Sequence, residues 1–121
     1  MFVRLYSGED GQSHFEAVDL PSDTVMHNGM EVAPGVNFRR FPADYFSDWH
    51  TAPRRQYIAV LSGTMEIGVG DGGTSRLGPG DVLLVEDLQG QGHTTRSVGG
   101  KPRVSVTIPL VSWAPWLPAG S

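Results

Sequence analysis

The chain has 121 residues, a length typical of a single domain. Its net charge of −4, with 39% hydrophobic and 18% charged residues, fits a globular protein and lacks the basic excess of a nucleic-acid binder. Zero cysteines exclude disulfides, a thiolate nucleophile and cysteine-ligated zinc. No apolar run approaches the ~20 residues that span a membrane, and the start lacks a secretory signal pattern, so we expect a cytoplasmic protein with no membrane or nucleic-acid partner.

Turn signals run through the whole chain, because its 16 glycines and 9 prolines are spread instead of gathered into a linker. Several windows alternate with period two, and none keeps helical spacing for three turns. In residues 103–108, arginine, serine and threonine alternate with valine and isoleucine. The predicted strands are 2–6, 14–19, 36–41, 55–61, 64–69, 74–77, 82–86, 93–98 and 103–110. Short, regularly spaced strands with glycine turns predict an all-β sandwich or barrel.

Two histidines flank this predicted meander in a way that suggests a site. His50 precedes the strand that ends at the turn of Gly63, and His93 follows Gly-Pro-Gly-Asp at 78–81 and a long loop. In a small barrel, both rings would point into one cavity. Alternate residues of a strand share a face, so two sets are expected to face inward. One set is His50, Ala52, Arg54 and Gln56, if 50–56 is extended throughout; the other is His93, Thr95 and Ser97. Pro53 can interrupt the first.

The residues resemble the cupin superfamily over about positions 36–110. Aligned on Gly63, the first cupin motif puts His50 at its first histidine, Ala52 at its second and Gln56 at its glutamate; the second motif is matched by Gly80, Gly90 and His93. Trp-His-x-Ala-Pro-Arg-Arg-Gln-Tyr, with a later Glu-Asp-x-x-Gly-x-Gly-His, looks like small single-domain bacterial cupins. The resemblance implies an all-β, single-domain cupin-type jelly-roll β-barrel over 1–121, with its motif-bearing core at about 36–110 and a Pro/Trp-rich tail at 111–121.

The departures from the motif concern the metal. A typical cupin gathers three histidines and a glutamate around a divalent ion, whereas here Ala52 cannot bind a metal and Gln56 is a weaker, neutral ligand. Glu86 stands at the place of the loop proline. The metal ligands that remain are His50, Gln56 and His93, for one divalent ion of unknown identity. No nucleotide or organic cofactor is predicted.

Three functions stay open for a small polar molecule in the cavity. The first is a divalent-metal-dependent lyase or isomerase, in which His50 and His93 are the catalytic residues and the metal polarises a carbonyl. The second is a non-catalytic small-molecule binding module. The third is a metal-free acid–base enzyme that uses the same two histidines.

Other polar and aromatic residues near the motif are candidates for binding the molecule: Trp49, Arg54, Gln56 and Glu86. The Arg54-Arg55 pair could hold a carboxylate or phosphate, but adjacent strand residues face opposite ways, which favours one solvated arginine and one paired with Glu86 or Asp87. Asp87 is expected to cap a turn, or else to act as a late ligand or base. Tyr57 is expected on the outer face, and His14 and His27 on the surface.

The tail carries two tryptophans within a proline-rich segment, Trp113 and Trp116. Exposed aromatics of this size favour an interface. The resemblance implies that homodimers are common, and we therefore expect a homodimer.

Overall fold

The computed structural model describes residues 1–19 and 31–111, which form ten strands in two sheets and contain no helix. The larger sheet has the order β2 (Ser13–Ala17), β1 (Phe2–Ser7), β8 (Val82–Glu86), β5 (Gln56–Ser62), β10 (Arg103–Pro109), β3 (Asn37–Phe41). The smaller sheet has the order β4 (Phe46–His50), β9 (His93–Val98), β6 (Thr64–Gly68), β7 (Thr74–Leu77). Within these ranges no helix is long and apolar enough to cross a membrane. His27, Trp113 and Trp116 lie outside the described residues.

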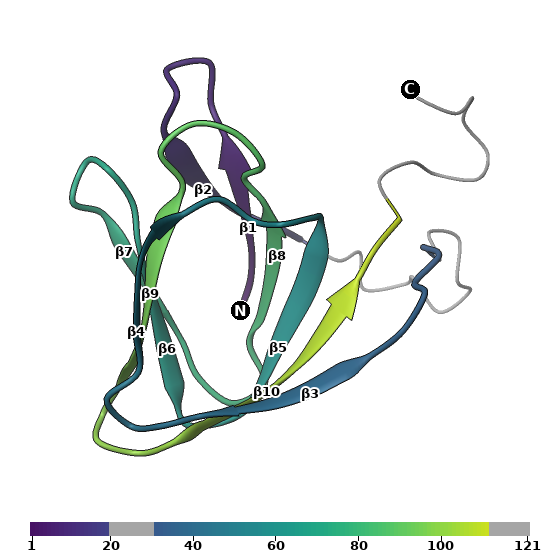
Figure 1. The fold of residues 1–121 in the computed structure, drawn as a ribbon, viewed down its shortest axis with the longest axis vertical. Helices are drawn as coiled ribbons and strands as arrows, with labels where there is room; N and C mark the ends of the chain where they lie inside the picture. Colours follow the sequence, from purple (N-terminus) through teal and green to yellow (C-terminus); the bar gives the residue numbers. More distant parts are fainter. Residues whose placement is uncertain (20–30, 112–121) are drawn as a thin grey trace.

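From β3 onward the chain crosses from one sheet to the other at nearly every connection. Strands β3, β5, β8 and β10 belong to the larger sheet, and β4, β6, β7 and β9 to the smaller. Figure 1 shows the two sheets facing each other, with β5, β10 and β3 along one side and β4, β9 and β6 along the other. The strands are antiparallel neighbours except for β1 and β8, which are parallel. This winding is a jelly roll, and the prediction of an all-β barrel is confirmed.

The turn from β5 into β6 depends on Gly63, as the sequence predicted. Gly63 has φ = +75°, and a Cβ there would lie 2.5 Å from the carbonyl oxygen of Pro102, in the connection from β9 to β10. Only glycine allows both this backbone conformation and this close approach.

The apolar core lies between the sheets and comes from both. Leu5, Val60 and Leu83 of the larger sheet meet Met65 and Ile67 of the smaller sheet, and all five side chains are fully buried. Burial of these side chains holds the two sheets face to face, because each fully buried aliphatic side chain contributes roughly 1.5–3 kcal/mol to the free energy of folding.

The structure differs from the predicted strands around His50. Residues 46–50 form β4, which the alternation pattern did not predict. Residues 51–55 form a crossing loop, so the condition that 50–56 is extended throughout is not met. Phe46 and Trp49 are both exposed, so the apolar residues of β4 do not mark a buried face. Pro53 lacks an N–H for a sheet ladder, which is consistent with its place in the loop.

Strand β10 is inverted relative to an ordinary strand of a barrel core. Its polar residues Arg103, Ser105 and Thr107 are buried and face the smaller sheet, whereas Val104 and Val106 face outward and are half-buried. Buried polar side chains need hydrogen-bonding partners, so we expect the barrel interior beside β10 to be polar and not part of the apolar core.

Candidate functional site

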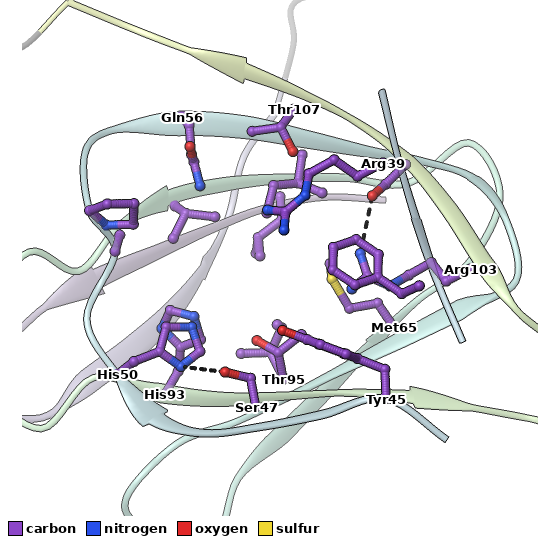
Figure 2. A pocket seen from close by; sticks show the side chains of 18 residues that line it. Arg39, Tyr45, Ser47, His50, Gln56, Met65, His93, Thr95, Arg103 and Thr107 are labelled. Carbon is purple, nitrogen blue, oxygen red and sulfur yellow. Dashed lines mark hydrogen bonds between the residues drawn. The ribbon is translucent and has the colours of Figure 1, made fainter. Parts of the chain in front are cut away.

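A cavity of about 290 Å³ lies between the two sheets. Its lining includes both polar side chains and five larger apolar ones, Ile58, Met65, Ile67, Leu83 and Val85. Figure 2 shows His50, His93 and Ser47 on one wall, Gln56 and Thr107 on the opposite wall, and Arg103 beside Tyr45 at the other end. An apolar pocket with a few convergent polar groups is the usual form of a small-molecule site.

His50 is the last residue of β4 and is oriented by local backbone. Its Nδ1 lies 2.6 Å from the carbonyl oxygen of Asp48 and 3.3 Å from the Ser47 hydroxyl oxygen. A carbonyl oxygen can only accept, so Nδ1 donates and carries the proton. In the neutral ring this leaves the lone pair on Nε2.

His93 is the first residue of β9 and is held by a buried carboxylate. Its Nδ1 lies 2.5 Å from Oδ2 of Asp87, and the hydroxyl of Ser13 donates to the same oxygen over 2.7 Å. Asp87 has 0% exposure and His93 has 4%. The carboxylate fixes the tautomer of His93 with Nδ1 protonated, so Nε2 is the nitrogen left for chemistry.

The two rings are brought together by the pairing of β4 with β9. His50 and His93 are opposite each other in the ladder after a bulge, and their ring centroids are 4.4 Å apart at an interplanar angle of 58°. Gly92 makes this approach possible: it has φ = +79°, and a Cβ there would lie 2.0 Å from the carbonyl oxygen of His50. Any side chain at 92 would separate the two histidines.

The structure brings only some of the predicted site residues together. Ala52 and Gln56 line the cavity with the two histidines, and so does Thr95. Trp49 and Arg54 do not: Trp49 is 43% exposed on the outer side of β4, and Arg54 is exposed in the crossing loop. The turn at 51–55 breaks the alternation that would have aimed Arg54 inward.

Glu86 also lies outside the cavity lining, because it faces the outer side of β8. There it accepts hydrogen bonds from Arg4 of β1 and from Arg55, whose Nε is 2.8 Å away. The predicted pairing of one arginine with Glu86 is thus confirmed, with Arg54 solvated. Arg55 also bonds to Glu31, which accepts from Tyr57 on the same outer face. Burial and the neighbouring Glu31 raise the pKa of Tyr57 to about 12.

Asp87 corrects a sequence expectation. It was expected to cap a turn, but its side chain bonds to Ser13 and His93. Strand parity could have found it, since Asp87 directly follows β8 and continues the alternation of Leu83 and Val85, and all three are buried. His14 behaves as expected at the surface, with its Nε2 3.0 Å from Asp10.

The sequence reading missed Arg39, Tyr45 and Arg103, all of which line the cavity. The available signal was the polar face of 103–107, noted in the alternation pattern without an assignment to the interior.

The donors in the cavity fit a divalent metal poorly. His50 and His93 offer two Nε2 atoms, and the side-chain amide of Gln56 lies on the opposite wall with its nitrogen end toward the cavity (Figure 2). Among the described residues no group of three His, Cys, Asp or Glu side chains is placed to hold a metal ion. Ala52, which aligns with the second histidine of the cupin motif, lines the same cavity but has no donor atom, and catalytic zinc sites use three firm protein ligands.

Comparison with known proteins supports the fold and no more. No protein-family model and no curated protein matches the chain. A solved structure, an uncharacterized conserved protein with a double-stranded β-helix domain from Klebsiella pneumoniae, matches with a TM-score of 0.52 and 22% identity, over 72% of this chain and 82% of that one. A protein from Neisseria meningitidis matches with a TM-score of 0.49 and 20% identity, over 72% of this chain and 88% of that one. Together with the crossing strands, the first match shows that the chain has a double-stranded β-helix, or jelly-roll, fold.

Proposed function

We propose that this barrel binds a small polar molecule in its cavity and exchanges a proton with it through His93, without a resident metal. The observation that carries the proposal is the buried Asp87–Ser13–His93 arrangement, with 2.5 Å between the carboxylate and Nδ1. A base oriented by a buried carboxylate is the arrangement on which general acid–base catalysis in triads depends. Asp87 acts as a positioning residue, because it acts through His93.

The two histidines have different surroundings, which assigns them different roles. His93 faces a carboxylate, which stabilises a positive charge on the ring after it takes a proton. His50 is held by a neutral carbonyl oxygen and a hydroxyl, which fix its orientation and provide no counter-charge. We therefore assign both proton abstraction and proton return to Nε2 of His93, at a carbon beside a carbonyl group as in an isomerase or lyase. The lone pair on Nε2 of His50 accepts a hydrogen bond from the bound molecule.

Deuterium exchange tests this assignment directly. The protein is incubated in D₂O with pyruvamide and with pyruvate, and loss of the methyl proton signal is followed by NMR. We expect exchange faster than in buffer, and a loss of about 100-fold or more of the acceleration in His93→Gln, as general-base catalysis typically contributes 10²–10⁴-fold. Arg54→Gln, at an exposed position away from the cavity, serves as the matched control. Exchange at the buffer rate with both compounds contradicts the proposed chemistry.

The positioning role of Asp87 has its own readout. In long-range ¹H–¹⁵N spectra, the wild-type rings of His50 and His93 should both show a protonated Nδ1. In Asp87→Asn, only His93 should change its tautomer, because Asn can donate to the ring where Asp accepts. The rate of deuterium exchange should fall in the same variant. An unchanged tautomer with lost exchange would indicate a merely structural effect of the substitution.

A non-catalytic binding module is the second candidate, favoured by the same cavity and by Ala52 and Gln56, which lack acid–base groups. It predicts ligand binding that survives His93→Gln and no exchange with either compound. Metal analysis of purified protein separates the remaining alternative: stoichiometric metal that is lost in His50→Ala and His93→Ala would support metal-dependent chemistry.

A further inference from the structure

Two arginines gather at the end of the cavity away from the histidines. Arg39 comes from β3 and Arg103 from β10, and these strands are antiparallel neighbours in which Arg103 pairs with Phe41 and Arg39 with Ser105. Both guanidinium groups lie over the ring of Phe41, with their Cζ atoms 3.9 Å (Arg103) and 4.8 Å (Arg39) from its centroid. Figure 2 shows Arg103 and Tyr45 on the side opposite His50 and His93, with Arg39 reaching over the cavity.

Arg103 is a buried cation without a counter-charge. Arg103 is 2% exposed, and its Nη1 donates a hydrogen bond to the neutral hydroxyl of Ser105 over 3.1 Å. Its Nε has no hydrogen-bond partner among the described residues. Within 1–19 and 31–111, neither Arg103 nor Arg39 forms an ion pair with a carboxylate, whereas the arginines at 4, 55, 76 and 96 all do.

This arrangement costs free energy in the empty protein. Taking a guanidinium out of water without pairing it is unfavourable, and a second cation over the same ring adds repulsion. Burial lowers the pKa of Arg103 to about 10, with the charge of Arg39 acting in the same direction and Tyr45 in the opposite one. Arg103 stays charged at neutral pH, so a chain with a net charge of −4 keeps a positive cavity end.

We propose that Arg103 and Arg39 bind the carboxylate of the molecule that the cavity takes, so that its ligand is a small carboxylic acid in ionised form. The inference rests on the proposed function, since it concerns the same cavity. The planar guanidinium fork matches the two oxygens of a carboxylate and favours it as the counter-charge. Phosphate sites commonly add amide donors from a helix N-terminus, and the described residues contain no helix. With its carboxylate bound by the arginines, the rest of the molecule would extend toward His93.

Binding of matched pairs tests the proposal. Pyruvate, benzoate and succinate are compared with pyruvamide, benzamide and succinamide by calorimetry and thermal unfolding, with inorganic phosphate as the alternative anion. We expect at least one carboxylate to raise the unfolding temperature and its amide to have no comparable effect. No binding by any of the three carboxylates overturns the proposal, and so does binding of phosphate alone.

Variants locate the binding. Arg103→Met and Arg39→Met should each weaken carboxylate binding roughly ten- to a hundredfold, as expected for the loss of a charge-assisted hydrogen bond. Arg40→Met is the matched control, because Arg40 is adjacent to Arg39 but opposite Val104 on the outer face, and it should leave binding unchanged. Equal losses in Arg40→Met and Arg39→Met would contradict a site in the cavity.

The stability of the unliganded variants separates a binding role from a structural one. If Arg103 is kept for a ligand, Arg103→Met without ligand should unfold at a temperature no lower than the wild type, since an unpaired buried charge is removed. A purely structural Arg103, held by Phe41, predicts a clear fall in unfolding temperature together with unchanged carboxylate binding in Arg39→Met, and this pair of results overturns the proposal.

The two proposals fail separately. Pyruvamide exchange that depends on His93, with no carboxylate bound through Arg103, leaves the proton-exchange function and removes the carboxylate inference. Carboxylate binding that needs Arg103, with no deuterium exchange in either compound, keeps the carboxylate inference and removes the proton-exchange function.

Discussion

Ala52 lines the cavity and aligns with the second histidine of the cupin motif, so we expect a histidine at this position to face His50 and His93. Because Ala52 and Gln56 line the same cavity as His50 and His93, the double variant Ala52→His, Gln56→Glu should present three imidazoles and a carboxylate. We expect it to bind Zn²⁺ or Ni²⁺ at least about a hundredfold more tightly than the parent, since imidazole and carboxylate are strong donors for these ions. Isothermal titration with the metal salt measures the gain.

The matched control for that experiment is Ala52→His, Arg54→Glu. It adds the same residue types but places the carboxylate at an exposed position outside the cavity. Its gain should be much smaller. Equal affinities for the two double variants would mean that Gln56 does not face the metal position and that the aligned motif is misplaced.

Strand parity explains which site residues the sequence could predict. His93 and Thr95 face the cavity because alternation along a strand is strict, and the pair His50–Gln56 was placed correctly for a different reason than expected. The two residues belong to different sheets and converge only because the loop at 51–55 crosses between them. Nothing local in the sequence distinguishes this loop from an extended strand except Pro53, so the outward position of Arg54 could not be derived.

At the scale of elements, β10 shows why the interior of the barrel could not be predicted from polarity alone. Alternation correctly separates Arg103, Ser105 and Thr107 from the valines, but a binary pattern assigns the apolar face to the core. The structure reverses this assignment, because the inner face of β10 borders a polar cavity. Elsewhere the usual rule holds, as in β8, where Leu83 and Val85 are buried.

Glu86 connects three strands of the larger sheet through charge. It is mostly buried on the outer face of β8 and accepts hydrogen bonds from Arg4 of β1 and Arg55, just before β5. Burial acts to raise the pKa of Glu86, but the bonds from the two arginines outweigh it and the pKa is lowered. A carboxyl whose pKa is lower in the folded protein stabilises the fold above its unfolded pKa, and this contribution is lost as the pH falls through the folded value.

We therefore expect Glu86→Gln to reduce the free energy of unfolding by about 2 kcal/mol at pH 7, as for charged hydrogen bonds. The difference from the wild type should shrink as the pH falls below the unfolded carboxyl pKa of about 4.3 and through the lower folded pKa, where the wild-type carboxyl takes up its proton. Urea unfolding at pH 7 and pH 3 measures both. Glu16→Gln, an exposed partner of Arg4 at 3.5 Å, is the control and should cost less than about 1 kcal/mol. A loss for Glu86→Gln that is the same at both pH values would indicate packing instead of charge.

At the scale of the whole molecule, the outer face of the larger sheet carries the apolar residues that the inverted β10 turns away from the cavity. Phe38 of β3, 71% exposed, pairs in register with Val106, which in turn pairs with Ala59 of β5. Among the strands of residues 1–19 and 31–111, β3 also lies at the edge of its sheet, with no strand paired to its outer side. An exposed apolar stripe beside a free edge favours association with a second copy, which gives the expected homodimer a structural basis that does not depend on the tail.

Light scattering after gel filtration should accordingly give a mass of twice the 13.1 kDa chain. Phe38→Lys should shift the protein toward the monomer without lowering its β-sheet content, because the side chain is exposed and the charge opposes burial of the stripe. Phe46→Lys, also at an exposed position (58%) but on β4 of the smaller sheet, should leave the mass unchanged. A wild-type mass of one chain contradicts the homodimer, and a dimer that resists Phe38→Lys but dissociates with Phe46→Lys assigns the interface to the opposite sheet. Since the cavity lies between the sheets, dimers formed through the outer face would leave both histidine sites open to small molecules.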